Sequence, residues 1–322
     1  MSEPVTVAFS MGDPHGIGPE VLLRALAAAR SQFPEMHPVV FGDSDYLRGL
    51  EEDLSIGADL SRIQIIPCGR YPYPPRWGSL EAAAGRFALA SLHAALRYCR
   101  REQLEVLVTA PLHKEAARLS DPSFSAGQTE LVGSYFPGSR PVMAFFSGQM
   151  KVVLATAHIP LREVAQQLSV PEIVRRGELF YRALERLGDN PRLAVCGLNP
   201  HASEGGLFGD EEARIVTPAV EELSRRLGPE AVSGPFPPDT IFREVLAGEF
   251  QGALALYHDQ GLIPLKLVAF ESAVNVSLGL PIVRTSPDHG TAFPIAGQGR
   301  ADGRSMLEAV RWGLRLRGTS QP

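Results

Sequence analysis

The stretch SLEAAAGRFALASLHAALRYCRREQLEVLVTAPLHKEA, residues 79–116, decides the fold class. Its first part, residues 79–100, predicts a long helix with Ser79 as N-cap and Glu81 in the first turn, where the helix dipole favours an acid. LEVLV (104–108) is a short apolar, β-branched run that predicts a strand. TAPLHKEA (109–116) then leaves that strand through a proline. A helix, a strand and a loop in this succession are typical of a parallel sheet covered by helices.

The same alternation continues on both sides of this stretch. Two further helices are expected at 169–188, with Ser169 as N-cap, and at 210–228, where Pro218 should kink the helix unless the helix begins there. Further strands are expected at VTVAF (5–9), PVVFG (38–42), IQIIP (63–67), VVLAT (152–156), LAVCG (193–197) and GALALY (252–257). The sequence therefore predicts an α/β fold, and in such sheets ligands bind at the carboxyl ends of the strands.

Composition excludes several classes of protein. The chain has 322 residues, enough for two domains or one large one, and a net charge of -5, which gives no electrostatic argument for nucleic-acid binding. No apolar run approaches the ~20 residues of a membrane span, and no signal peptide is evident, so a cytoplasmic location is expected. Cys68, Cys99 and Cys196 lack metal-site spacing and are expected to be free or buried thiols.

Three histidines stand out because each follows a predicted strand in a loop rich in proline or glycine. They are His158 in TAHIPL, His201 in GLNPHASEGG and His258 in LYHDQGLIPLK. Neutral imidazole is a common zinc ligand, and three protein ligands leave one coordination position open, as in catalytic sites. A lone loop histidine is more often structural, however, and three others (His15, His113 and His289) lie in similar turns. The residue pattern leaves this choice open.

Other motifs have both a functional and a structural interpretation. GDPHGIGPE (12–20) does not match G-x-G-x-x-G, so a strand-to-helix turn is the favoured interpretation. Lys114 can anchor an anion or assist proton transfer, or it can be a solvated surface lysine. Gln128 and Thr129 can bind an anion near a helix start, or Thr129 can simply cap the helix.

The last third of the chain adds cations and glycines. Lys266 and Arg284 supply two positive charges for an anionic substrate. The segment DHGTAF, followed by IAGQG, has glycines suited to a close approach of the backbone to a ligand.

Taken in order, these motifs make the chain resemble the 4-hydroxythreonine-4-phosphate dehydrogenase (PdxA) family of vitamin B6 (pyridoxine) biosynthesis. The resemblance covers almost the whole chain and rests on GDPHGIGPE, TAPLHKEA, TAH, NPHASEGG, YHDQGLIPLK and NVSLGLPIVRTSPDHGTA. It implies a two-domain α/β/α architecture like that of isocitrate and isopropylmalate dehydrogenases. The expected domains are 1–130 with 285–322, and 131–284, which carries the metal histidines and the dimer contacts. It also implies a homodimer whose active site lies in the interdomain cleft and draws residues from both subunits.

The resemblance also selects residues for each role. It implies His158, His201 and His258 as metal ligands, and Lys114 and Asp259 as candidates for proton handling. The implied substrate contacts are Gln128, Thr129, Lys266, Asn275 and Arg284. The implied nicotinamide-nucleotide contacts are Asp288, His289, Gly290 and Gly297.

The implied reaction is a metal-dependent oxidation by NAD or NADP. The substrate would be 4-phosphohydroxy-L-threonine, oxidised to 2-amino-3-oxo-4-(phosphooxy)butanoate and then decarboxylated to 3-amino-2-oxopropyl phosphate. Zinc suits histidine ligation, with magnesium, cobalt or manganese as alternatives. No nucleic-acid or membrane partner is expected.

Two departures from the family pattern keep alternatives open. Gln128 stands where the family usually has histidine, so a dehydrogenase for D-threonate or D-erythronate 4-phosphate is the alternative, and one for cis-dihydrodiol carboxylates is more distant. Pro294 stands where the wider superfamily tends to have an acidic residue, which affects the cofactor contacts. A non-catalytic metal- or phosphate-binding protein and a metal-dependent hydrolase are the alternatives from other classes.

Overall fold

A computed structural model describes residues 4–124 and 127–318. The chain divides into two compact units, unit 1 (Met1–Pro141 with Val274–Pro322) and unit 2 (Val142–Ala273). Both junctions differ from those expected after residues 130 and 284. Val132 and Phe136 pack into the core of unit 1, which moves the first junction. Residues 274–278 pair with the strand that follows them, which moves the second.

The sheet of unit 1 has the strand order β3-β2-β1-β4-β11-β10. Neighbouring strands are parallel except for the antiparallel pair β10 and β11. The strand bounds are β1 Val5–Ser10, β2 Met36–Gly42, β3 Gln64–Pro67, β4 Val106–Thr109, β10 Val274–Leu278 and β11 Val283–Pro287. The first four confirm predicted strands, whereas β10 and β11 were not predicted as strands.

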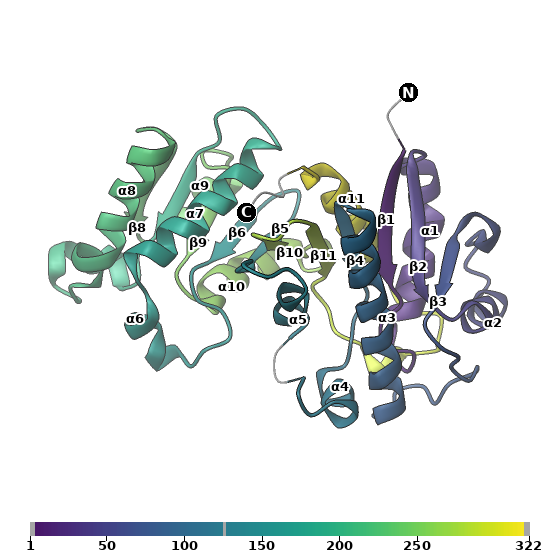
Figure 1. Ribbon diagram of the computed structural model, residues 1–322. Coiled ribbons are helices and arrows are strands. Elements are labelled where there is room, and N and C mark those ends of the chain that lie inside the picture. Colours follow the sequence, from purple (N-terminus) through teal and green to yellow (C-terminus); the bar gives the residue numbers. More distant parts are fainter. Residues whose placement is uncertain (1–3, 125–126, 319–322) are drawn as a thin grey trace. The chain divides into compact units, whose positions relative to one another are not determined.

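Helices cover both faces of this sheet (Figure 1). Leu107 of β4 packs with Leu92 and Leu96 on one face, while Val106 lies against Gly313 on the other, as the two-residue period of a strand requires. The helices are α1 Gly18–Gln32, α2 Ser44–Leu54, α3 Ala82–Glu102, α4 Lys114–Ser120, α5 Gln128–Ser134 and α11 Arg304–Leu316, with short 3-10 turns η1 Leu60–Arg62 and η5 Phe293–Ile295.

The N-cap expected for the long helix α3 is wrong. The cap is Glu81, not Ser79. The Ser79 hydroxyl instead donates to the Arg76 carbonyl (2.6 Å) and lies 2.9 Å from His15 Nδ1, so the turn before the helix uses this side chain.

The sheet of unit 2 has the strand order β5-β6-β9-β7-β8. Its neighbours are parallel except for β5 and β6. The strands are β5 Val142–Phe146, β6 Lys151–Leu154, β7 Leu193–Cys196, β8 Val232–Phe236 and β9 Gly252–Ala255. The predictions for β6, β7 and β9 are confirmed, and β5 and β8 were missed.

Helices again pack on both faces of the sheet of unit 2 (Figure 1). Leu262 and Leu265 join Val245 over one face, and Phe180 contacts Gly252 on the other. The helices are α6 Val164–Gln167, α7 Val170–Glu185, α8 Thr217–Leu227, α9 Ile241–Leu246 and α10 His258–Ala269, with the short turns η2 Leu161–Glu163, η3 Pro200–Gly206 and η4 Glu212–Val216.

Two expectations about these helices can be compared with the structure. Ser169 is the N-cap of α7, as predicted. The helix expected over 210–228 is divided into a π-helical turn, Glu212–Val216, and α8, which begins at Thr217. Pro218 therefore lies in the first turn of α8, where its missing N–H has no intrahelical partner to lose.

Cys68, Cys99 and Cys196 are all free thiols, and the last two are buried. Among the described residues, no helix is both long and apolar enough to cross a membrane.

Candidate active site

The three loop histidines follow three neighbouring parallel strands of unit 2. His158 comes after β6, His258 begins α10 directly after β9, and His201 lies in the loop after β7. These strands are adjacent in the order β6-β9-β7, so their carboxyl ends lie at one edge of the sheet. The expectation that each histidine follows a strand is confirmed.

Side-chain hydrogen bonds fix the three strand ends to one another. The Thr156 hydroxyl, two residues before His158, donates to the Leu256 carbonyl at 2.7 Å. Gln260 is buried, accepts the Leu256 N–H at 2.6 Å and donates to the Gly197 carbonyl at 2.7 Å. Gln260 thus joins the histidine-bearing loops after β9 and β7. Sequence reasoning gave this residue no role, although it lies in the quoted YHDQG motif.

Two of the three histidines meet within the chain. The ring centroids of His158 and His258 are 5.6 Å apart. His258 Nδ1 lies 2.7 Å from an oxygen of Asp259, a carboxylate contact that orients metal-binding imidazoles in many proteins. Within residues 4–124 and 127–318, no three His, Cys, Asp or Glu side chains are arranged to hold a metal ion. His201 is therefore not brought to the other two.

The backbone around His201 has an unusual conformation. Residues 201–205 all have positive φ, from 45° at Glu204 to 74° at Ser203, so the segment makes a left-handed turn. This conformation costs a non-glycine residue on the order of 1–2 kcal/mol. The His201 ring lies 6.4 Å from that of Phe208. A left-handed run of non-glycine residues has no propensity signal, so the sequence could not predict it.

Glu212 holds the start of this turn. Its carboxylate accepts the backbone N–H groups of Leu198 and Asn199, both at 2.7 Å, and the Asn199 side-chain amide at 2.9 Å. Burial raises the pKa of Glu212, but these hydrogen bonds outweigh it, and the net pKa is lowered. The carboxylate is therefore a stable anchor at neutral pH.

Unit 1 carries a buried cation beside Gln128. Arg284 on β11 is 3% exposed. Its Nε and Nη2 donate to the Thr109 hydroxyl at 3.1 and 2.7 Å, and Nη2 also donates to Gln128 Oε1 at 2.8 Å. Burial lowers the pKa of Arg284 to about 10. Two of the predicted substrate contacts are thus in direct contact, and Thr109 joins them as a residue without an assigned role.

Other predicted residues lie close to this pair or on the same hairpin. Lys114 Nζ lies 3.8 Å from the point where a Cβ on Gly127 would sit, so it is beside the turn that leads to Gln128. Thr129 is buried in the first turn of α5, but the N-cap is Gly127, so the simple capping interpretation of Thr129 is wrong. Asn275 lies on β10 and its Oδ1 is buried without a hydrogen-bond partner among the described residues.

Lys266 and the expected cofactor segment complete the predicted set. Lys266 lies half-buried in the last turn of α10. Asp288 and His289 follow β11, and His289 Nε2 is buried without a hydrogen-bond partner in the described part of the chain. A Cβ on Gly290 would meet nothing within 4 Å, whereas one on Gly297, at φ +73°, would lie 2.6 Å from Trp77. Gly290 therefore leaves open space, and Gly297 is required by packing on the indole.

The GDPHGIGPE loop lies against this segment. The Ile17 N–H donates to the Thr291 carbonyl at 3.0 Å, and a Cβ on Gly16 would clash with Thr291 at 2.7 Å. Asp13 is fully buried, and one carboxylate oxygen lacks a hydrogen-bond partner among described residues. Burial raises the pKa of Asp13. The interpretation as a strand-to-helix turn between β1 and α1 is confirmed.

Comparison with known proteins adds to this geometry. The family model described as pyridoxal phosphate biosynthetic protein PdxA matches residues 21–313. This chain belongs to the PdxA family. It is 42% identical over 319 residues to a 4-hydroxythreonine-4-phosphate dehydrogenase of Desulfosudis oleivorans, with 94% of each chain covered. It is 37% identical over 330 residues to a D-threonate 4-phosphate dehydrogenase of Salmonella typhimurium, covering 98% of this chain and 99% of the relative.

Solved structures agree with the PdxA assignment. The 4-hydroxythreonine-4-phosphate dehydrogenase of Klebsiella pneumoniae has a TM-score of 0.82 and 37% identity, covering 100% of this chain and 99% of the other. A β-decarboxylating dehydrogenase of Thermococcus kodakarensis shares the fold alone, with a TM-score of 0.54 and 11% identity over 97% of this chain and 83% of the other. The expected α/β fold class is confirmed, and the chain is a dehydrogenase of the PdxA family.

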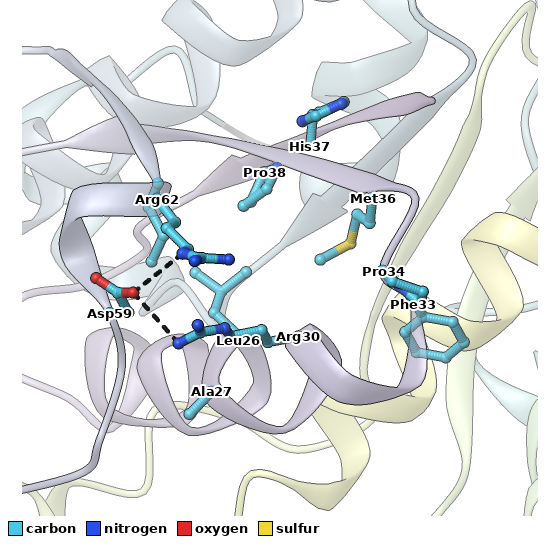
Figure 2. A pocket seen from close by; sticks show the side chains of 11 residues that line it. Leu26, Ala27, Arg30, Phe33, Pro34, Met36, His37, Pro38, Asp59 and Arg62 are labelled. Carbon is cyan, nitrogen blue, oxygen red and sulfur yellow. Dashed lines mark hydrogen bonds and ion pairs between the residues drawn. The ribbon is translucent and has the colours of Figure 1, made fainter. Parts of the chain in front are cut away.

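A pocket elsewhere in unit 1 of this PdxA-family chain contains none of the predicted site residues. It has a volume of about 420 Å³, and Arg30 and Arg62 both point to Asp59 beside it (Figure 2). Met36 and Pro38 place it at the amino end of β2. Parallel sheets bind ligands at their carboxyl ends, so we do not assign the chemistry to this pocket.

Proposed function

We propose that this chain uses NAD or NADP to oxidise the secondary alcohol of 4-phosphohydroxy-L-threonine. The product, 2-amino-3-oxo-4-(phosphooxy)butanoate, then loses CO2 to give 3-amino-2-oxopropyl phosphate. Membership of a dehydrogenase family supports the oxidation. The observation that carries the choice of an anionic substrate is Arg284, a buried cation that, within the described part of the chain, is hydrogen-bonded only to the neutral side chains of Thr109 and Gln128.

Each predicted residue has a chemically suitable role in this reaction. Lys266 and Arg284 would attract the phosphate and carboxylate groups of the substrate. Gln128, Thr129 and Asn275 would hydrogen-bond its polar groups. Lys114 and Asp259 would handle protons, Asp259 also through its contact with His258.

The donor chemistry of unit 2 suits a divalent metal. His158, His201 and His258 would hold it as neutral imidazoles, a set that suits zinc and also admits cobalt, manganese or magnesium with added oxygen ligands. The metal, when bound, supplies Lewis-acid chemistry at the substrate oxygen. Within one chain the rings of His158 and His258 meet, which supports these two as a pair of ligands.

The nicotinamide nucleotide would be held by Asp288, His289, Gly290 and Gly297 in unit 1. The unpartnered, buried Nε2 of His289 and the open space at Gly290 support this assignment. The packing of Gly297 on Trp77 gives that residue a structural role, so its contribution would be to the shape of the loop.

A second candidate is oxidation of D-threonate or D-erythronate 4-phosphate. Relatives with both substrate names match this chain at similar identity. Gln128 is the residue that keeps this candidate open, because a neutral amide cannot supply the charge of a protonated histidine.

A coupled assay distinguishes these candidates. The purified protein is incubated with a divalent metal, NAD+ or NADP+, and each phosphorylated acid, and formation of reduced nicotinamide is followed by absorbance. We expect one acid to give by far the largest kcat/KM. Lys266→Ala should raise KM, while Arg162→Ala, at an exposed arginine of the same unit, should not. Absence of nicotinamide reduction with every acid would rule out the proposed function, and phosphate release instead would indicate a hydrolase.

A further inference from the structure

The guanidinium of Arg284 is held entirely by neutral groups. Its three hydrogen bonds go to Thr109 Oγ1 and Gln128 Oε1, and among residues 4–124 and 127–318 no carboxylate forms an ion pair with it. The carboxylate of Glu130 favours the charged form of Arg284 through space, but among the described residues it forms no hydrogen bond or ion pair with the guanidinium. A buried cation without an ion-pair partner is destabilising unless an anion joins it. The arrangement therefore lacks the carboxylate of a structural ion pair and suits the binding of an anionic ligand.

The chemistry of arginine fixes the orientation of Gln128. A guanidinium only donates hydrogen bonds, so the amide atom that faces Arg284 has to be the oxygen. The amide nitrogen then points elsewhere, and its one hydrogen bond, to the Ala110 carbonyl, is long at 3.4 Å. Gln128 is half-buried, so its remaining N–H is directed to a position that a ligand can reach.

Thr109 supports the guanidinium from the adjacent strand β4. Its hydroxyl oxygen accepts both Nε and Nη2 of Arg284, and the side chain is fully buried. Because its hydroxyl oxygen accepts two N–H groups of Arg284, Thr109 would act on a ligand through the position of the guanidinium. Nη1 is then the donor group that no described residue uses.

Ser277 adds an unused hydroxyl on the same face. It pairs with Arg284 across the antiparallel strands β10 and β11, so the two side chains lie next to each other on one side of the sheet. Ser277 is 1% exposed, and its Oγ has no hydrogen-bond partner in the described residues. A hydroxyl beside an unpaired cation can donate to the anion that the cation attracts.

We propose that Thr109 is a positioning residue for Arg284 and that Gln128 is a specificity residue that turns a permanently neutral N–H donor to the anionic group of the substrate. This rests on the proposed function for the identity of that group, a phosphate or carboxylate of a phosphorylated hydroxy acid. Ser277 belongs to the same donor set. The site then presents a cation with hydrogen-bond donors around it.

The neutrality of Gln128 has a consequence for pH dependence. A histidine at this position could accept from Arg284 only while neutral, and its protonation near pH 6.5 would place two cations together. Glutamine does not titrate, so substrate binding through this residue is constant across that range. The phosphate of the substrate titrates at about pH 6 with both proteins. Gln128→His should add a second inflection in KM between about pH 5.5 and 7.5 that is absent from the profile of the unmodified protein.

The test measures anion binding separately from turnover. The variants are Thr109→Val, Thr109→Ser and Gln128→Glu. Calorimetry gives the Kd of inorganic phosphate for each, and steady-state kinetics with the best substrate give KM and kcat. Thr109→Val keeps the side-chain shape but removes the acceptor, and should weaken phosphate binding and raise KM by ~10-fold or more with kcat little changed. Thr109→Ser restores the hydroxyl and should return both values to within ~3-fold.

Gln128→Glu is the decisive variant because it separates structural from binding roles. The carboxylate would pair with Arg284, so the thermal midpoint should hold or rise, while the cancelled charge should weaken phosphate binding by ~30-fold or more. If Arg284 and Gln128 served only to stabilise the fold, this variant would bind phosphate as well as the unmodified protein.

Three results would overturn the proposal. They are unchanged phosphate binding in folded Thr109→Val, unchanged binding in Gln128→Glu, and no phosphate binding by the unmodified protein. Failure of the proposed function would look different. No phosphorylated acid would be oxidised, while the phosphate affinities of the variants would still differ as expected above.

Discussion

At the scale of single residues, Gln260 has the clearest structural role next to the histidines proposed as metal ligands. It pairs with the Leu256 N–H and the Gly197 carbonyl, two backbone groups that would otherwise be buried without partners. We expect Gln260→Leu to lower the free energy of unfolding by about 2–4 kcal/mol. Urea denaturation measures this change.

The same substitution should affect metal binding, because Gln260 fixes the loops after β7 and β9. We expect metal affinity to fall by roughly 10- to 100-fold, the usual effect of losing a residue that supports ligands. Gln167→Leu is the matched control, since Gln167 is exposed on α6, and it should change stability by less than about 0.5 kcal/mol. Unchanged stability and metal affinity in Gln260→Leu would contradict this role.

At the scale of elements, Glu212 in the π-helical turn η4 holds the left-handed turn around His201. Its lowered pKa sets the sign of the pH effect. Stability from this group is full above its ordinary pKa of 4.5 and is lost as pH falls through the lower pKa of the folded state. Glu212→Gln should therefore lower stability by about 1–3 kcal/mol at pH 7, with less difference in strong acid.

Glu211→Gln is the control for this prediction. Among the described residues, Glu211 accepts one hydrogen bond, from the Asn199 amide at 2.8 Å, and none from the backbone of the turn. At pH 7, Glu211→Gln should lower the free energy of unfolding by much less than Glu212→Gln does. Equal effects of the two variants in urea denaturation at pH 7 would show that the backbone hydrogen bonds of Glu212 are not the cause.

The loop after β11 gives a paired test of two glycines. Gly297 has φ +73° and its hydrogen lies against Trp77, so Gly297→Ala adds both backbone strain and a clash. We expect a loss of about 1–3 kcal/mol. Gly290→Ala, in the same loop with open space around it, should be close to neutral. Thermal denaturation of the two variants compares them directly, and similar midpoints would contradict the packing argument.

The elements show which parts of the fold the sequence could predict. Apolar runs such as 104–108 and 193–197 identified strands buried on both faces, because their pattern has no polar interruption. Strands β10 and β11 were not predicted, because the polar residues Asn275, Ser277 and Arg284 occupy one face of that hairpin. Polar residues placed for binding mask the apolar pattern on which strand prediction depends.

At the scale of the whole molecule, the sequence predicts which residue types form the candidate site but not how these residues are arranged in space. Strand order places His158, His258 and His201 on adjacent strand ends, although more than forty residues separate each from the next along the chain. Contacts such as Gln260 with Gly197 connect residues that no local pattern relates. The resemblance named the three histidines, and the fold of one chain brings together His158 and His258.

The separation of His201 from the other two leads to a test of the expected homodimer with a shared active site. His201→Ala and His258→Ala should each abolish turnover while each variant remains folded. If one subunit supplies His158 and His258 and its partner supplies His201, a mixed dimer of the two variants keeps one intact site. Random re-pairing of a twofold dimer makes half of the dimers mixed, so about a quarter of the unmodified turnover should return. If each chain supplies all three ligands to its own site, mixing restores nothing. Light scattering establishes the dimer, and metal analysis of the mixture shows whether the recovered turnover follows recovered metal.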